Sequence, residues 1–163
     1  MAEVNLRKIT SDNDEECLRL EVQESQKGFV ASNAKSLDFA KKNTTMFPLA
    51  IYDVAARGYA TEEVPVPMVG FTMYHLLEDH VGFILRLMVD KAHQRKGYGR
   101  AAMVEVIRRL KLYPEVEMIA TSYRRVNEAA ENLYRSLGFV PWEIEWARVD
   151  KSEVYLKLPE WRW

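Results

Sequence analysis

Short blocks of apolar residues along this chain predict a series of strands. Each block either alternates with polar residues or is nearly all apolar, as expected for strands that bury one or both faces. The most continuous block, 82–89, is expected to be a central strand covered on both faces. The connection at 56–67 is too long for a tight hairpin and is expected to be a surface flap. The predicted strands are residues 4–9, 46–54, 68–77, 82–89, 117–122, 139–146 and 153–158.

Helical spacing occupies the segments between these strands. In the last two predicted helices, apolar residues recur at i, i+3, i+4 and i+7, so each buries one face. Gly138 suits the left-handed position that follows a helix. Alternating strands and helices without a repeat favour one α+β or α/β domain over residues 1–163. The predicted helices run from N-cap candidates at 10–13 to about Glu24, over 36–42, from Arg100 to before Pro114, and from Ala130 to Leu137.

Composition narrows the class of protein. The 163 residues, 48% of them hydrophobic, suffice for one ordinary core. A net charge of −1 offers no global attraction to nucleic acid or to an anionic membrane. Cys17 has no partner for an internal disulfide, and no signal-like or 18-residue apolar run occurs. We therefore expect a soluble protein of the cytoplasm.

A glycine-containing loop is the first candidate for chemistry. It follows the predicted strand 82–89 and opens a helix, where backbone N–H groups without partners and the helix dipole favour an anion. Gly97 and Gly99 have no Cβ to keep a phosphate away from these groups. The spacing is neither a Rossmann fingerprint nor a P-loop. The loop reads Gln94-Arg95-Lys96-Gly97-Tyr98-Gly99.

A second cluster makes the pattern specific: Asn127-Glu128-Ala129-Ala130-Glu131-Asn132-Leu133-Tyr134-Arg135-Ser136-Leu137-Gly138-Phe139. Gln-x-x-Gly-x-Gly followed by Asn-x-x-Ala-x-x-x-Tyr-x-x-x-Gly-Phe resembles the GNAT superfamily of N-acetyltransferases, which move an acetyl group from acetyl-CoA to an amine. From residues 24–32 to its end, the chain looks like the bacterial diamine and spermine/spermidine acetyltransferases. The resemblance implies an α+β fold of three layers, with a mixed, mostly antiparallel twisted sheet splayed at the acetyl-CoA site.

The resemblance also implies a set of binding residues. Loop amides would hold the CoA pyrophosphate, and strand residues would pair with the pantetheine amides like an added strand. Asn127 would bond the pantetheine arm, although an Asn before a helix is also an ordinary N-cap. Lys96, Arg100, Arg124 and Arg125 either reach the ribose phosphate or form a solvated basic face. The implied acetyl-CoA residues are Leu87, Met88, Val89, Gln94, Arg95, Lys96, Gly97, Tyr98, Gly99, Arg100 and Asn127.

Acetyl transfer needs a general acid and a general base, and the sequence offers one tyrosine for the first and four candidates for the second. Periodicity places Tyr134 on the apolar stripe of its helix, whereas the family motif makes it the general acid that protonates the leaving thiolate. The base that deprotonates the ammonium is Glu24, His75, Glu78 or Asp79, directly or through water. The three histidines lack the spacing of a metal site, so no metal is expected.

Acceptor recognition rests on side chains around the predicted acetyl site. Arg86 interrupts an apolar strand, so it is either part of a structural ion pair or a substrate contact. The substrate candidates are Glu24, Phe29, His75 and Arg86, and selectivity is expected to come from segments 23–30, 57–67 and 142–146. Acidic and aromatic residues in these segments suit a cationic amine. The resemblance to the diamine and spermine/spermidine acetyltransferases implies a polyamine or diamine as the acceptor.

Other functions and an assembly stay open. The acceptor could instead be an aminoglycoside or a protein amine, and the chain could be a CoA-binding sensor without turnover. Trp161 and Trp163 at the end of the chain could cover a second subunit, so a homodimer is also expected.

Overall fold

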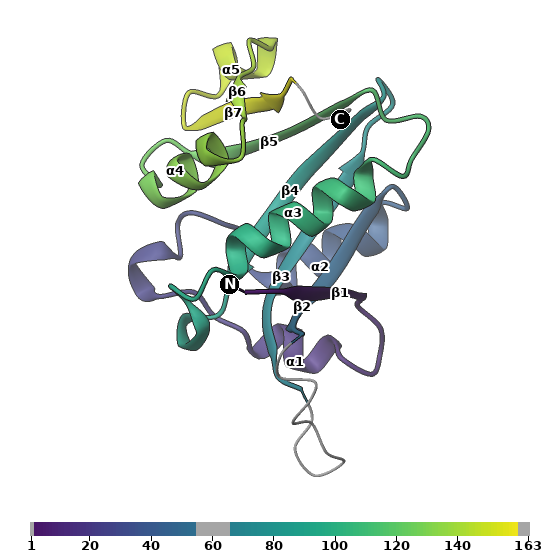
Figure 1. The fold of residues 1–163 in the computed structure, drawn as a ribbon, viewed down its shortest axis with the longest axis vertical. Helices are drawn as coiled ribbons and strands as arrows, with labels where there is room; N and C mark the ends of the chain where they lie inside the picture. Colours follow the sequence, from purple (N-terminus) through teal and green to yellow (C-terminus); the bar gives the residue numbers. More distant parts are fainter. Residues whose placement is uncertain (1, 55–65, 160–163) are drawn as a thin grey trace.

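One mixed sheet forms the centre of the protein. The computed structural model describes residues 2–54 and 66–159, which contain a seven-stranded sheet of order β1-β2-β3-β4-β5-β7-β6 (Figure 1). Neighbouring strands are antiparallel except β4 and β5, which are parallel, as the predicted fold requires. The strands are β1 (Val4–Lys8), β2 (Met46–Asp53), β3 (Met68–Leu76), β4 (Val81–Val89), β5 (Met118–Arg124), β6 (Val140–Pro141) and β7 (Glu153–Leu158).

Helices cover both faces of this sheet. Figure 1 shows α3 in front of the central strands and α2 behind them. One apolar cluster joins α3 and α4 to the sheet, and a second joins α1 and α2 to the opposite face. The helices are α1 (Asp14–Arg19), α2 (Asn33–Lys42), α3 (Tyr98–Leu110), α4 (Glu128–Ser136) and α5 (Glu145–Val149), with short 3-10 turns at Glu24–Gln26 and Lys91–His93.

The first predicted helix is too long, and the second too short. Helix α1 ends at Arg19 rather than near Glu24, because the Glu21 N–H donates to the Asp90 carboxylate and the Lys91 N–H donates to the Glu21 carbonyl. These tertiary bonds replace the helical ones. Helix α2 begins before residue 36, because the Ser32 hydroxyl accepts from a backbone N–H and caps it.

The predicted strand at 139–146 is also wrong over most of its length. Pairing is limited to Val140 and Pro141, since proline brings no N–H to a ladder. The chain then turns into α5, where the Trp146 ring lies 6.3 Å from that of Tyr155. Residues 55–65, with most of the predicted flap, and 160–163, with both terminal tryptophans, lie outside the described residues.

The sheet opens between β4 and β5. The two strands pair only from Val81 to Ile84 on β4 and from Met118 to Thr121 on β5. The β3–β4 register shifts beside this point and leaves Leu85 opposite no residue, and such a bulge bends its strand. Beyond it β4 follows β3 and β5 follows β7, so the strands diverge (Figure 1). The predicted splay is confirmed.

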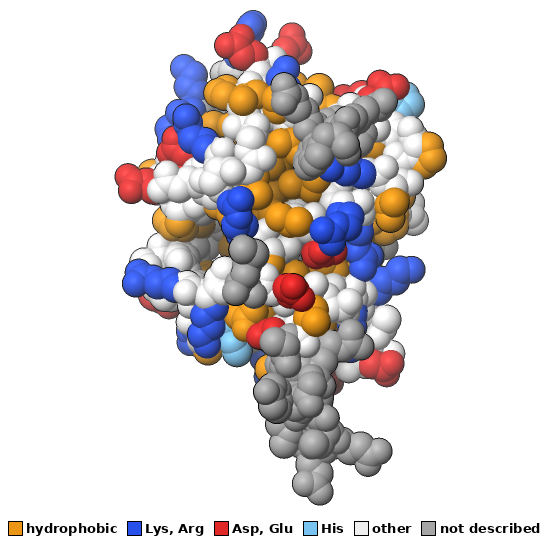
Figure 2. Space-filling view, viewed as in Figure 1, with side chains coloured by type: hydrophobic (Ala, Val, Ile, Leu, Met, Phe, Trp, Pro, Cys, Tyr) orange, Lys and Arg blue, Asp and Glu red, His pale blue; other side chains and the backbone are white. Residues whose placement is uncertain are grey.

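Charges of both signs are spread over the surface. In Figure 2, Lys and Arg side chains lie among Asp and Glu around small apolar patches, in keeping with the net charge of −1. Among the helices of the described residues, none is long and apolar enough to cross a bilayer.

Candidate active site

A cavity of about 950 Å³ lies at the splay between β4 and β5. This volume suits a small-molecule ligand. Segment 22–35 forms one side, and the β4–α3 loop forms another. The remaining wall comes from the second half of β4, the end of β5, the start of β7 and helix α4. The bulge and the divergence of the strands therefore make the site.

The outer edge of β4 is open toward this cavity. At the fork, the Thr121 hydroxyl donates to the Ile84 carbonyl over 2.9 Å. Further along, the Gln94 side-chain amide donates to the Val89 carbonyl over 2.9 Å. Between these two points, no strand of the described residues pairs with β4 on that side. An extended ligand with amide groups can pair there as an added strand.

The start of α3 is built to accept an anion. Its N-cap, Gly97, has a φ of 86°, and Arg95 has a φ of 62°. Backbone of this kind turns successive N–H groups into one concavity. Across the described residues, no protein acceptor is recorded for the N–H groups of 95–100, and no side chain caps the helix. Donors and helix dipole thus remain available to a ligand phosphate.

The two loop glycines have different reasons to be glycine. Gly97 needs the left-handed backbone, which other residues adopt only with strain. Gly99 has no such need, because a Cβ there would meet only the Leu133 and Val89 side chains at 3.8 and 3.9 Å. Both glycines line the cavity. The fold itself leaves room for a larger residue at 99. Glycine at this position would therefore allow a ligand to lie close to the backbone.

Tyr134 lies buried at the fork. It is 6% exposed, with its ring 6.2 Å from that of Tyr123 and 5.9 Å from that of Phe139. Burial raises the pKa of its hydroxyl to about 12, although a hydrogen bond with the Thr121 side chain offsets part of this rise. The phenol therefore keeps its proton at neutral pH and can donate it into the cavity that it lines.

Asn127 serves the structure directly. Its side-chain oxygen accepts from the Ala130 N–H at 3.2 Å and so caps α4. The residue also lines the cavity, so a ligand can lie beside it.

Glu153 is a cavity residue that the sequence did not single out. It is directly opposite Arg124 in the β5–β7 register, with a carboxylate oxygen 3.4 Å from the guanidinium and 22% of the side chain exposed. Burial raises the pKa of this carboxyl, while Arg124 and a hydrogen bond from Ser122 lower it in part. The sequence predicts the strand but not its partner, so it gives no sign that Glu153 faces a cavity.

The structure brings most of the predicted site residues together. Phe29 and Arg86 line the cavity with Tyr134 and Asn127. Lys96 and Arg100 are exposed and outside the lining. The cavity wall also includes the predicted acetyl-CoA residues Leu87, Met88, Val89, Gln94, Arg95, Gly97, Tyr98 and Gly99.

The four candidate bases from the sequence lie elsewhere. Glu24 is exposed and paired with Lys27 at 2.9 Å. His75 is hydrogen-bonded to Thr45 at 3.0 Å, and residues 78–79 are exposed in the β3–β4 turn. None of these candidates lines the cavity.

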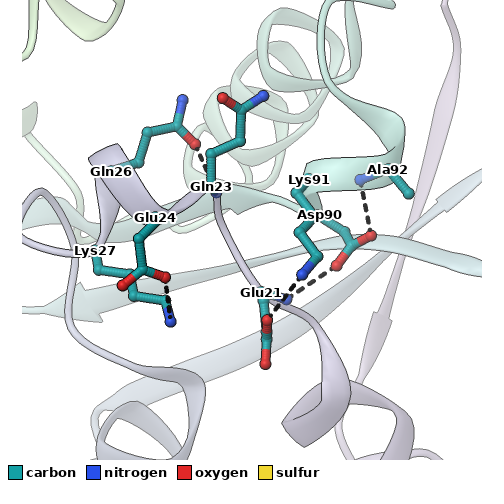
Figure 3. A network of polar contacts seen from close by, with 8 residues as sticks. All are labelled: Glu21, Gln23, Glu24, Gln26, Lys27, Asp90, Lys91 and Ala92. Carbon is teal, nitrogen blue, oxygen red and sulfur yellow. Dashed lines mark hydrogen bonds and ion pairs between the residues drawn. The ribbon is translucent and has the colours of Figure 1, made fainter.

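A polar network joins the two sides of the cavity mouth. The Glu21 N–H donates to the Asp90 carboxylate at 2.9 Å, and the Lys91 ammonium lies 3.1 Å from Glu21 (Figure 3). The side-chain amides of Gln26 and Gln94 donate to each other at 3.2 and 2.8 Å. The first residue of the glycine motif therefore holds the segment that faces it across the mouth.

Comparisons with known proteins agree with this geometry. The acetyltransferase (GNAT) family model matches residues 24–139, more than half of the chain. A domain from Methanocaldococcus jannaschii DSM 2661 has a TM-score of 0.72 at 15% identity, over 96% of this chain and 98% of that one. Spermidine N-acetyltransferase from Vibrio cholerae, solved with CoA and spermine, has a TM-score of 0.68 at 12% identity, over 95% and 93%.

A further solved structure widens the range of acceptors among the neighbours. The ribosomal-protein-S18-alanine N-acetyltransferase from Escherichia coli has a TM-score of 0.65 at 19% identity, over 96% of this chain and 93% of that one. A comparison with curated proteins gave no significant sequence match.

The family match extends over the glycine loop and Tyr134. The chain therefore belongs to the GNAT family of acetyltransferases, enzymes that use acetyl-CoA.

Proposed function

We propose that this protein moves the acetyl group of acetyl-CoA to a primary amine of a small molecule, with Tyr134 as general acid. The observation that carries the proposal is the coincidence of three features in one cavity. They are the open edge of β4, the uncapped start of α3 and a buried, protonated tyrosine at the fork between them.

The residues present fit acetyl-CoA. N–H groups of the β4–α3 loop and of α3 would hold the pyrophosphate, and backbone groups of Leu87 and Val89 would pair with the pantetheine amides. Acetyl-CoA, when bound, supplies an acetyl group on a thioester and a thiolate as leaving group. The Tyr134 hydroxyl would give its proton to that sulfur.

Glu153 is the carboxylate base that we propose for this cavity. Among the described lining residues it is the one carboxylate, and its raised pKa suits proton transfer better than that of an exposed carboxyl. It would take the proton that the acceptor ammonium must lose before the amine can attack.

The two groups act from opposite faces of the sheet. Tyr134 packs on Tyr123, in the apolar cluster that α3 and α4 cover. Glu153 is opposite Arg124, the next residue along β5, so its side chain points to the other face. The acceptor would thus enter from the α2 side of the sheet, and the thiol would leave on the α3 and α4 side.

The polyamine acceptor suggested by the sequence has mixed support. One structural neighbour, the spermidine N-acetyltransferase, was solved with spermine. The carboxylates of this chain that would attract a second ammonium, Glu24, Glu78, Glu143 and Glu145, do not line the cavity. We therefore propose a small primary amine as the acceptor, a class in which polyamines are one member.

An amine panel with thiol release as readout tests the proposed function. The panel holds spermidine, a monoamine of similar length, an amino acid, an aminoglycoside and a short peptide. Amine-dependent thiol release matched by acetylated product is expected for at least one small amine. Acetyl-CoA binding without turnover on any amine would contradict the proposal and favour the sensor module.

A further inference from the structure

Arg86 places a positive charge in the cavity wall, and no carboxylate of the described residues forms a direct ion pair with it. Its guanidinium is half-buried, and it reaches the α2 side of β4, where its Nε donates to the Ser36 hydroxyl at 3.2 Å. One Nη1 hydrogen bond goes to the Leu85 carbonyl at 3.0 Å. Both acceptors are neutral, and no ion pair of Arg86 is recorded among residues 2–54 and 66–159. The structural ion pair considered from the sequence is therefore not present there.

A guanidinium in this state can still bind a carboxylate. It carries five N–H donors in a planar fork and stays protonated in proteins. The two bonds to Ser36 and Leu85 leave three donors of Arg86 without an acceptor in the described chain. Carboxylates match the fork with two parallel bonds. A half-buried charge that lacks such a partner is costly, and a bound anion relieves that cost.

The other charges of the wall have different assignments. Lys27 is paired with Glu24, and Arg124 with Glu153. Arg95 belongs to the loop at the opposite end, before α3. Lys35, which also lines the cavity, has no ion pair recorded among the described residues.

The acceptor side of the cavity thus has more cationic than anionic groups. No carboxylate of residues 2–54 and 66–159 forms an ion pair with Arg86 or Lys35 on this wall, and Glu153 is already paired with Arg124. Unpaired positive charges repel a second ammonium and attract an anion. This arrangement favours an amine that carries its own negative charge over a polyamine.

We propose that the acceptor is a small amine that bears a carboxylate, and that Arg86 binds this carboxylate while the amine faces Glu153. The inference rests on the proposed acetyl transfer and specifies its substrate class. Arg86 is the second residue beyond the fork on β4, next to the point where the acetyl group would lie. A zwitterionic acceptor places one charge on each of these two residues, which lie within electrostatic range of each other.

Matched pairs of acceptors test the inference. Glycine, leucine and methionine are each compared with their carboxamides, beside spermidine, and kcat/KM is measured by thiol release at pH 8. The amine of a carboxamide is the less protonated one at this pH, so the bias of the assay opposes the expected result. The wild-type enzyme should prefer the carboxylate of at least one pair by about 10-fold or more, as hydrogen bonds to a charged group allow.

Variants then assign the preference to Arg86. In Arg86→Gln, the preference should fall to about twofold or less through a higher KM for the carboxylate, with kcat/KM for the carboxamide little changed. Arg86→Lys keeps the charge without the fork and should retain part of the preference. Arg108→Gln removes the same charge from an exposed site on α3 and should behave like wild type. Calorimetry with CoA and thermal unfolding check that each variant is folded.

Each other outcome would contradict either the carboxylate acceptor, the role of Arg86 or the proposed acetyl transfer. Equal rates within every pair, or faster turnover of spermidine than of any carboxylate, would overturn the inference and leave acetyl transfer standing. A preference that survives in Arg86→Gln would remove Arg86 as the binding residue. A uniform loss for both members of each pair would make its role structural. Thiol release with no amine at all would contradict the proposed function itself.

Discussion

Replacing Tyr134 by Phe removes a single hydroxyl from the fork and leaves the ring packing in place. The rings of Tyr123 and Phe139 still contact the new side chain, and the Thr121 hydroxyl keeps its bond to the Ile84 carbonyl. The loss is then one buried hydrogen bond, so the free energy of unfolding should fall by about 1 kcal/mol. Affinity for CoA should be unchanged.

The effect on turnover should be far larger. General acid catalysis contributes about 100- to 10,000-fold, which corresponds to about 2.7–5.4 kcal/mol in the activation free energy. Because burial raises the pKa of Tyr134 to about 12, the acid holds its proton throughout the neutral and mildly basic range. Wild-type kcat should therefore show no fall on the basic side that comes from this group below about pH 10.

The assay is kcat at saturating acetyl-CoA and amine, measured by thiol release from pH 6 to 10. Tyr113→Phe is the matched control, since it removes a tyrosine hydroxyl 2.6 Å from that of Tyr74, outside the cavity lining. It should keep wild-type kcat. If folded Tyr134→Phe turns over like the parent, another group protonates the thiolate, and Tyr134 is a core residue only.

Three further changes test the site. Gly99→Ala should leave thermal unfolding unchanged, since the added Cβ meets only side chains at 3.8 Å or more. It should weaken CoA binding about 10-fold in calorimetry, because the methyl group blocks close approach of the phosphate to the helix N–H groups. Unchanged affinity would argue against this loop as the pyrophosphate site. Glu153→Gln should lower kcat/KM and remove the decrease of kcat/KM at low pH. In the wild type this decrease should occur above the ordinary carboxyl pKa, because burial raises the pKa of Glu153. An unaltered pH profile would exclude Glu153 as the base. Gln26→Ala should raise the KM for both substrates, because it removes the two hydrogen bonds between Gln26 and Gln94. If segment 21–30 of the variant resists proteolysis as well as in the wild type, these bonds do not hold the segment in place.

The sequence by itself determined the elements that local chemistry specifies. The apolar run of β4 and the i, i+3, i+4, i+7 spacing of α3 and α4 are properties of the chain alone. Gly97 and Gly138 both adopt the left-handed backbone that only glycine takes easily, and Asn127 caps α4. For the same reason the motif located the loop before α3, because a phosphate there would meet backbone groups rather than distant side chains.

Tertiary structure decided everything that depends on which segments meet. Helix α1 stops early because the Glu21 N–H donates to the Asp90 carboxylate and the Glu21 carbonyl accepts from the Lys91 N–H, and the periodicity of the sequence gives no sign of these contacts. Glu153 became a candidate base only once β7 paired with β5, which set its carboxylate beside Arg124 and into the cavity. The sequence around Arg86 likewise does not distinguish a structural ion pair from a substrate contact. Only the packing of α2 and the splay of β4 from β5 leave its guanidinium without a direct ion pair among the described residues, since burial and pairing are properties of the assembled sheet.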